Sequence, residues 1–229
     1  MLLQFLDWLL ISYHVKQSNC KSTLKFRSES SGLLRGWIAV IRTIRKSRFW
    51  EERVMYLKLV RPSREYAEQV MQYKEDMLAN NDSFDGCAGL EEVNSFTEWI
   101  DFENRLKRKY GEGYVPSEVF LGVRIEDDKV VGIIDYRHPL TPFLLKYGGN
   151  IGYSILPSER QKGYASEMLK LLLAICREFG EKKVLLTCDK TNEASRKTII
   201  KNGGVLESEI PDDVGLSESG IIQRYWINL

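Results

Sequence analysis

The sequence predicts a three-layer α/β domain over residues 55–229, with helices on both faces of a central sheet. The first reason is that helix-like and strand-like segments alternate along this part of the chain. The second reason is composition, because 43% hydrophobic and 28% charged residues are ordinary proportions for a globular protein. A chain of 229 residues has room for one such domain with an appendage.

The expected helices are stretches with apolar residues at helical spacing. Ser63 can cap the first of them, and Gly203 follows the last. The third is the most apolar and carries Met168, Leu172 and Phe179 on one face, so we expect that face to be buried. The four helices are expected at residues 63–80, 95–110, 165–179 and 192–202.

The expected strands are short segments of alternating or continuous apolar residues. Residues 126–129 join two of them as a hairpin. Residues 80–94 and 139–149 are expected to be loops, because they are polar or contain glycine and proline. The strands are expected at residues 56–61, 119–125, 130–136, 150–156, 183–188, 205–210 and 223–228.

Residues 1–54 differ from the rest of the chain in charge. They carry ten Lys and Arg against four Asp and Glu, whereas residues 55–229 carry 23 basic and 28 acidic side chains. The acidic body is unsuited to nucleic acid, because phosphate contacts need clustered basic residues. Residues 16–53 show no sustained period, which is typical of loop or disorder.

The first fifteen residues are apolar, but they include Asp7 and are too short to span a bilayer. They lack the basic region and the cleavage site of a signal peptide. We therefore expect no stable membrane insertion, although an interfacial helix followed by basic residues is a second interpretation.

A different origin for this leader is also consistent with the sequence. Residues 50–54 (WEERV) can be encoded by a string that contains GGAGG, a bacterial ribosome-binding site, just before the codon of Met55. We therefore hypothesise that natural translation starts at Met55, so that residues 1–54 are upstream sequence read as protein.

Cysteine and histidine usage bears on compartment and metals. Cys20, Cys87, Cys176 and Cys188 show no short paired spacing, which argues against a zinc knuckle and a disulfide scaffold and suits a reducing cytosol. Two histidines leave little material for a histidine metal site. We expect a cytoplasmic protein without a metal.

The run GYSILPSERQKGYA, residues 152–165, indicates a phosphate-binding turn. A strand leads into a short basic turn, and Gly163 then precedes an apolar helix. The first amides of a helix are unpaired and carry partial positive charge, so they attract phosphate groups. Gly163 and Ala165 lack bulk, and Arg160 and Lys162 add positive charge. A structural turn with solvated basic residues is the alternative interpretation.

The spacing Arg160-x-x-Gly163-x-Ala165 resembles the acyl-CoA-binding motif of the GNAT superfamily of N-acetyltransferases. The runs 192–195 (NEAS) and 201–204 (KNGG) resemble that family's next helix and its exit, and the likeness covers residues 56–228 in element order. The likeness is greatest to small bacterial members whose third strand ends in an Arg-His pair, here Arg137 and His138.

The resemblance implies the three-layer α/β/α acyl-CoA N-acyltransferase fold, with a mixed, mostly antiparallel central sheet and acetyl-CoA (coenzyme A) as cosubstrate. In that family the pyrophosphate lies on the start of the helix, and the pantetheine arm lies along the preceding strand. The resemblance thus implies cofactor binding by Ile155, Leu156, Arg160, Gln161, Lys162, Gly163, Tyr164, Ala165, Ser166, Asn192 and Ser195.

The family's catalytic features are only partly present. Backbone N–H groups near a splay between strands four and five polarise the thioester, here within residues 153–156. The usual tyrosine proton donor is replaced by Ile199, so that role is vacant or filled elsewhere. Tyr153 or Tyr164 could substitute, and packing is the alternative interpretation of each. The candidate bases near strand ends are Glu118, Asp135 and His138, although Asp135 could instead pair with Arg137 and His138 could be an ordinary surface residue.

Together these features predict an enzyme that transfers an acetyl group from acetyl-CoA to a primary amine of a small molecule or to an exposed amino group. The acidic body weakly favours a cationic amine. A non-catalytic acyl-CoA-binding regulatory module is the alternative, because the usual tyrosine is missing. No nucleic-acid partner is expected, and a homodimer is left open.

Overall fold

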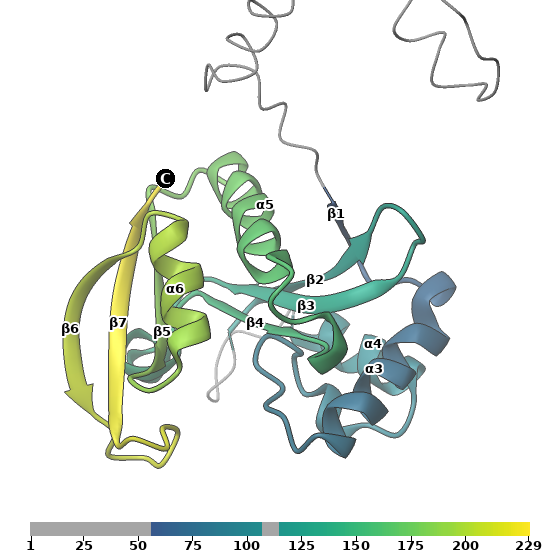
Figure 1. The fold of residues 1–229 in the computed structure, drawn as a ribbon, viewed down its shortest axis with the longest axis horizontal. Helices are drawn as coiled ribbons and strands as arrows, with labels where there is room; N and C mark the ends of the chain where they lie inside the picture. The colour runs from purple at the N-terminus through teal and green to yellow at the C-terminus, as the bar shows by residue number, and fades with distance from the viewer. Residues whose placement is uncertain (1–55, 107–114) are drawn as a thin grey trace, which may run out of the picture. The chain divides into compact units, whose positions relative to one another are not determined.

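The computed structural model describes residues 56–106 and 115–229. The expectations for residues 1–54, and for the end of the helix predicted at 95–110, fall outside the described residues. The elements in chain order (Figure 1) are β1 (Leu57–Val60), η1 (Arg64–Tyr66), α3 (Ala67–Ala79), η2 (Leu90–Glu92), α4 (Phe96–Leu106), β2 (Ser117–Arg124), β3 (Val130–Arg137), η3 (Leu144–Gly148), β4 (Ile151–Ile155), η4 (Pro157–Glu159), α5 (Tyr164–Glu178), β5 (Lys183–Asp189), α6 (Glu193–Lys201), β6 (Val205–Pro211) and β7 (Ile221–Asn228).

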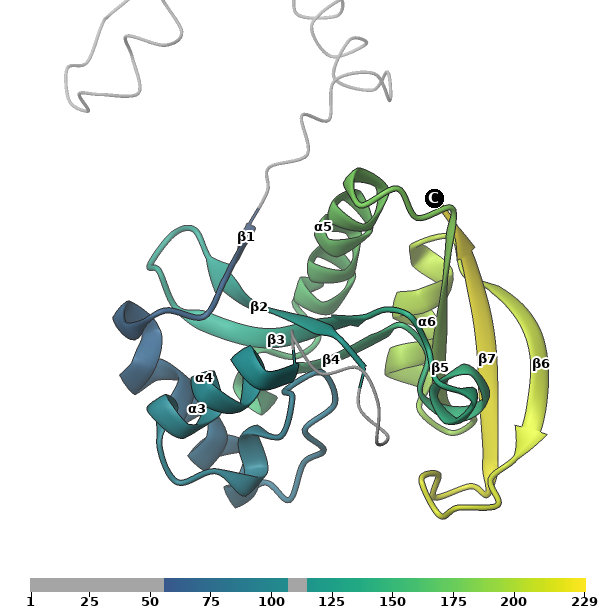
Figure 2. The same ribbon diagram turned by 180° about the vertical axis from the view of Figure 1, so that it is seen from behind.

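The strands of the expected central sheet form two hydrogen-bonded parts, which separate where the resemblance implies a splay between strands four and five. One sheet has the order β1-β2-β3-β4 and the other has the order β5-β7-β6. Every neighbouring pair within them is antiparallel. The division falls between β4 and β5, and Figures 1 and 2 show the two sheets diverging at this place.

Helices cover both faces of the four-stranded sheet, as predicted. Phe120 and Ile134 face α5 and belong to the hydrophobic core on that side. Their chain neighbours Val119 and Ile133 face α3 and α4 and belong to a second core. This alternation is the period of two expected for strands buried on both faces. The predicted three-layer α/β fold is therefore confirmed (Figures 1 and 2).

Two glycines allow α5 to lie close to the sheet. Gly122 on β2 and Gly132 on β3 face each other, and Met168 of α5 lies over both. A Cβ atom at Gly122 would lie 2.6 Å from the Met168 sulfur, and one at Gly132 would lie 2.6 Å from Ile155 Cδ1. Both distances are shorter than van der Waals contact, so larger residues would push the helix off the sheet.

The third predicted helix is confirmed as α5, and Met168, Leu169, Leu172, Leu173 and Cys176 are buried. The expectation for Phe179 was wrong, because its side chain is 51% exposed. The chain leaves the helix at this point, and Gly180 follows with φ of +87°.

In residues 56–106 and 115–229, no helix is long and apolar enough to cross a membrane. The same residues contain no group of three or more His, Cys, Asp or Glu side chains that could hold a metal ion. Cys87, Cys176 and Cys188 are free and buried.

Candidate active site

The turn between β4 and α5 exposes a run of backbone donors. The 3-10 turn η4 ends at Glu159, Gln161 has φ of +62°, and Gly163 caps α5 with φ of +88°. The first helical bond is made by the Glu167 N–H, which donates to the Gly163 carbonyl at 3.1 Å. Within the described residues, the N–H groups of Gln161 to Ser166 donate to no other protein group. Such a run at a helix start is suited to an anion.

The space in front of these amides is open. A Cβ atom placed on Gly163 would have no atom within 4 Å. Glycine is thus favoured here for two reasons, because its positive φ disfavours other residues and because a side chain would project into the open space. Free amides and room beside them fit a diphosphate group.

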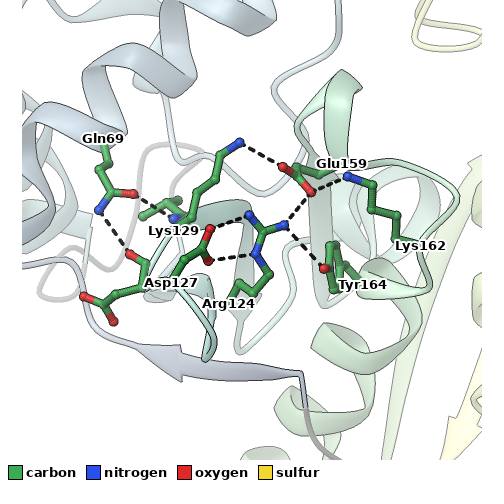
Figure 3. A network of polar contacts seen from close by, with 9 residues as sticks. Gln69, Arg124, Asp127, Lys129, Glu159, Lys162 and Tyr164 are labelled. Atoms are coloured by element: carbon green, nitrogen blue, oxygen red, sulfur yellow. Dashed lines mark hydrogen bonds and ion pairs between the residues drawn. The ribbon is translucent and has the colours of Figure 1, made fainter.

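The basic side chains of the turn have protein partners in this structure. Arg160 Nε donates to the Ile155 carbonyl at 3.1 Å, and its Nη2 lies 2.8 Å from Asp82 Oδ1. Lys162 Nζ donates to Glu159 Oε2 at 2.8 Å (Figure 3). Lys162 thus remains beside the open amides, while the Arg160 guanidinium is held against β4 and Asp82.

Other predicted contact residues of this turn have structural partners too. The Tyr164 hydroxyl accepts from Arg124 Nη1 at 3.4 Å (Figure 3). Ser166 on the first turn of α5 accepts two bonds from Asn202 Nδ2, at 3.1 Å to its carbonyl and 3.2 Å to its hydroxyl. The end of α6 is thereby fastened to the start of α5.

In the described residues, the hydrogen bonds between the two sheets are made by one asparagine at the start of β4. The Asn150 N–H donates to the Leu185 carbonyl at 2.7 Å, and the Leu185 N–H donates to Asn150 Oδ1 at 2.8 Å. Beyond these bonds, β4 and β5 share no hydrogen bond in the described residues. The asparagine side chain takes the place of the next backbone acceptor, so the two strands diverge from this point.

This divergence leaves one edge of β4 unpaired. The Leu156 N–H donates to Val131 and the Arg137 N–H donates to Asn150, so even-numbered residues of β4 turn their peptide groups toward β3. Because peptide groups alternate along a strand, Tyr153 and Ile155 turn theirs toward the splay. The backbone of Leu156 is already engaged, since its carbonyl accepts from Glu159.

Tyr153 connects β4 to α6 across the splay. Its hydroxyl lies 3.0 Å from the Ser195 hydroxyl. Burial raises the pKa of Tyr153 to about 12, so the phenol is protonated at neutral pH. Asn192 caps α6 by accepting from the Ser195 N–H at 3.0 Å. Ile199, at the position of the family's usual tyrosine, is fully buried in the core.

The three candidate bases do not converge. Asp135 is buried on the α3 and α4 face, where it accepts from Arg137 Nε at 2.7 Å and Nη2 at 2.9 Å. It also accepts from the Gly152 N–H at 2.9 Å and from the Ser117 hydroxyl at 3.3 Å. Its oxygens are thus occupied by hydrogen bonds.

Glu118 and His138 lie on the other face of the sheet. Glu118 is opposite Tyr136, which belongs to the α5 core, and it forms an ion pair with Arg61. His138 stacks on Tyr136, and its Nδ1 lies 3.1 Å from Glu181 Oε1, beyond the C-terminal end of α5. Since α5 starts at the turn and has 15 residues, His138 is about one helix length, roughly 20 Å, from the free amides.

Several residues of the site were missed by sequence reasoning. Glu159 lies inside the motif, and its spacing of three from Lys162 could have indicated their ion pair. No sequence signal indicated a role at this site for Arg124, Lys129 or Asn150, because their bonding partners are distant in sequence.

The chain resembles known acetyltransferases in sequence and in fold. Residues 57–205 match the family described as Acetyltransferase (GNAT) domain. No curated protein sequence matches the chain significantly. Similar solved structures include RimL, a ribosomal L7/L12 alpha-N-protein acetyltransferase, in complex with coenzyme A, with a TM-score of 0.57, 17% identity, and coverage of 76% of this chain and 94% of RimL.

Two further structures show the same fold. The acetyltransferase from Salmonella typhimurium that modifies the N-terminal serine of L7/L12 has a TM-score of 0.54 and 17% identity, covering 76% of this chain and 95% of its own. The microcin C7 self-immunity acetyltransferase MccE, in complex with acetyl-CoA and AMP, has a TM-score of 0.52 and 18% identity, covering 76% and 93%.

The family match spans most of the described domain, and the fold agrees with it. The divided sheet and the free amides at the start of α5 agree with this family assignment. The chain therefore belongs to the GNAT acetyltransferase family of N-acetyltransferases, which use acetyl-CoA as cosubstrate.

Proposed function

We propose that this protein transfers an acetyl group from acetyl-CoA to a primary amine, carried either by a small molecule or by the exposed amino group of a peptide. The main support is the run of free amides from Gln161 to Ser166, at the start of α5 and next to the splay. Bound acetyl-CoA supplies the acetyl group already activated as a thioester. The protein has to bind it, orient it and move protons.

Binding of the cofactor uses backbone more than side chains. The amides of Gln161 to Ser166 would hold the diphosphate, with Lys162 beside them. The peptide groups of Tyr153 and the N–H of Ile155 would bind the amide-rich pantetheine arm, as a sheet edge binds an added strand, whereas the Ile155 carbonyl is already bonded to Arg160. Arg160 and Asn192 would contribute by shaping the turn and the start of α6, since both are already bonded within the protein.

Tyr153 is the proton donor that the geometry favours for the departing thiolate. Its phenol is protonated at neutral pH, as tyrosine ordinarily is, and burial raises its pKa further, to about 12. Its hydroxyl bonds to that of Ser195, which could relay a proton from solvent back to the phenolate after transfer. Tyr153 thus fills the role that Ile199 cannot.

Of the three candidate bases, Asp135 is the least suited to accept a proton. Its carboxylate is buried and bonded to Arg137, and a proton on it would break that pair. Glu118 and His138 keep exposed surface and remain the base candidates.

The acceptor can be identified with a panel of amines that includes the kind of substrate named for the similar structures. Acetyl-CoA would be incubated with a peptide bearing a free N-terminal serine, a lysine peptide with a blocked N-terminus, and a small polyamine. Release of free thiol and acetylated product by mass spectrometry are expected with at least one amine. Tight coenzyme A binding without thiol release for a broad amine panel would instead support the non-catalytic module.

A further inference from the structure

A buried carboxylate lies directly beneath the phosphate-binding turn. Glu159, at the end of η4, is 4% exposed. Its Oε2 accepts from Arg124 Nη1 and from Lys162 Nζ, and its Oε1 accepts from Lys129 Nζ, each at 2.8 Å (Figure 3). A negative charge beside an anion site is unexpected, because by Coulomb's law it opposes the binding of phosphate.

The carboxylate is firmly ionised. Burial alone would raise the pKa of Glu159, but hydrogen bonds from Lys129 and Lys162 and the charge of Arg124 outweigh it and lower the pKa to about 2. Among residues 56–106 and 115–229, the one other carboxylate paired with these three cations is that of Asp127, which lies 2.6 Å from Arg124 Nη2. The cluster therefore keeps an excess of one positive charge.

Two of the three cations of this cluster, Arg124 and Lys129, belong to a hairpin that is itself held in place. Arg124 ends β2 and Lys129 precedes β3. Gln69 of α3 fastens the hairpin through two bonds, donating to the Asp128 carbonyl at 3.1 Å and accepting from the Val130 N–H at 2.8 Å (Figure 3). Glu159 thus connects the turn to a rigid part of the sheet.

Apart from the bonds of Tyr164 to Arg124 and of Ser166 to Asn202, the turn has few other restraints. Gln161 and Gly163 both have positive φ, and the backbone N–H groups from Gln161 to Ser166 have no protein acceptor among the described residues. The conformation of the turn therefore depends on side-chain contacts. On one side Arg160 is bonded to Asp82 and to the Ile155 carbonyl, and on the other Lys162 is bonded to Glu159.

We propose that Glu159 is a positioning residue, which holds the amides of Gln161 to Ser166 in the geometry that binds the diphosphate of coenzyme A esters. The proposal rests on the proposed function. Glu159 acts through Lys162 and the hairpin cations and does not itself touch the cofactor. The gain from ordered amides exceeds the electrostatic cost of the buried negative charge.

The variant Glu159→Gln tests this by the sign of its effect. If Glu159 mattered only through charge, its neutralisation would tighten binding of an anion. A positioning role predicts the opposite, and we expect coenzyme A affinity measured by isothermal titration calorimetry to fall on the order of tenfold, as for other supporting contacts of a binding site. The turnover number at saturating acetyl-CoA should stay within about twofold, because the reacting groups are untouched.

Asp127→Asn is the matched control. It removes the same charge from the same cluster, but Asp127 contacts Arg124 and not the turn. Its coenzyme A affinity should stay within about twofold of wild type. Wild-type or tighter affinity in Glu159→Gln overturns the proposal, and so does an equal loss in Asp127→Asn.

A second variant covers poor folding of the first. Glu159→Asp keeps the charge, but its shorter side chain cannot reach all three cations, so we expect coenzyme A affinity to fall by about fivefold. Wild-type affinity in this variant also overturns the proposal.

Failure of the proposed function has its own outcome. If the wild-type protein does not bind coenzyme A, the proposed function fails. The positioning role is then judged without ligand, from the NMR order parameters of the backbone amides of residues 161–166. Lower values in Glu159→Gln than in wild type support it, and equal values overturn it.

Discussion

Replacing Gly163 by alanine separates the cost of backbone strain from the loss of the phosphate site. Gly163 and Gly180 flank the two ends of α5, with φ of +88° and +87°. Neither would have an atom within 4 Å of an added Cβ. The two glycines therefore differ in place but not in conformation or crowding, which makes Gly180→Ala a matched control.

Each substitution should cost about 1–2 kcal/mol of folding free energy, the usual cost of a left-handed conformation for an L-residue. For a domain of this size that corresponds to a fall in Tm of roughly 2–8 °C. We expect similar falls for both variants, measured by thermal denaturation without ligand.

The effect on coenzyme A binding should differ. An amide binds a phosphate oxygen at about 2.9 Å, whereas a methyl carbon keeps other heavy atoms at about 3.5 Å or more. The methyl of Gly163→Ala would therefore push the phosphate away from several amides at once. We expect the affinity to fall by at least about tenfold, which is about 1.4 kcal/mol. Gly180→Ala should bind coenzyme A as wild type does.

Isothermal titration calorimetry with coenzyme A measures this difference. The reasoning is refuted if Gly163→Ala binds as tightly as Gly180→Ala, or if both lose affinity to the same extent. In the first case the phosphate does not approach Gly163. In the second case strain in α5, rather than steric exclusion at the turn, would explain the loss.

Three further predictions follow from the same structure. Tyr153→Phe should lower the turnover number by about 10²-fold, the usual contribution of a general acid, with little change in the KM for acetyl-CoA; an unchanged turnover number rules Tyr153 out as the donor. Asp135→Asn should lower the free energy of unfolding in urea by about 3–5 kcal/mol, because it leaves the largely buried Arg137 guanidinium without its carboxylate partner, and a stable variant with only a shifted pH–rate profile would instead indicate a base. The free energy of unfolding of Glu159→Gln should be about 3 kcal/mol lower than that of wild type above pH 4.5, and this difference should shrink as the pH falls toward 2. The reason is that folding lowers the pKa of Glu159 from 4.5 to about 2, so the carboxylate stabilises the fold only while it is ionised. A difference that does not change with pH contradicts this assignment.

Local sequence determined much of this protein. Apolar spacing predicted α5 at residues 165–179, and the structure has it at Tyr164–Glu178. The strand expected at residues 183–188 is β5, Lys183–Asp189, and the helix expected at residues 192–202 is α6, Glu193–Lys201. The glycine turn before α5 could also be predicted from the sequence, because a positive φ and a helix start with free amides depend on a few consecutive residues.

Contacts between segments that are distant in the chain could not be predicted from the sequence. The sheet divides at Asn150 because its side chain accepts the Leu185 N–H, and no local pattern identifies that pairing. Asp135 and Glu118 were both candidate bases, yet β2 and β3 pair in a register that places them on opposite faces. Register is a property of two strands together, so neither strand alone reveals it.

The sequence by itself therefore determined the family, the order of the elements and the place of the glycine turn before α5. Only the tertiary structure showed which side chains form ion pairs with the residues of that turn. Arg160 and Lys162 were both expected to add positive charge to that turn, and in the structure Arg160 is paired with Asp82 and Lys162 with Glu159. Asp82, the partner of Arg160, comes from another part of the fold, and Glu159, the partner of Lys162, is buried by it. The energy of an ion pair depends on the dielectric and the charges around it in space, so it cannot be read from the neighbouring residues in the sequence.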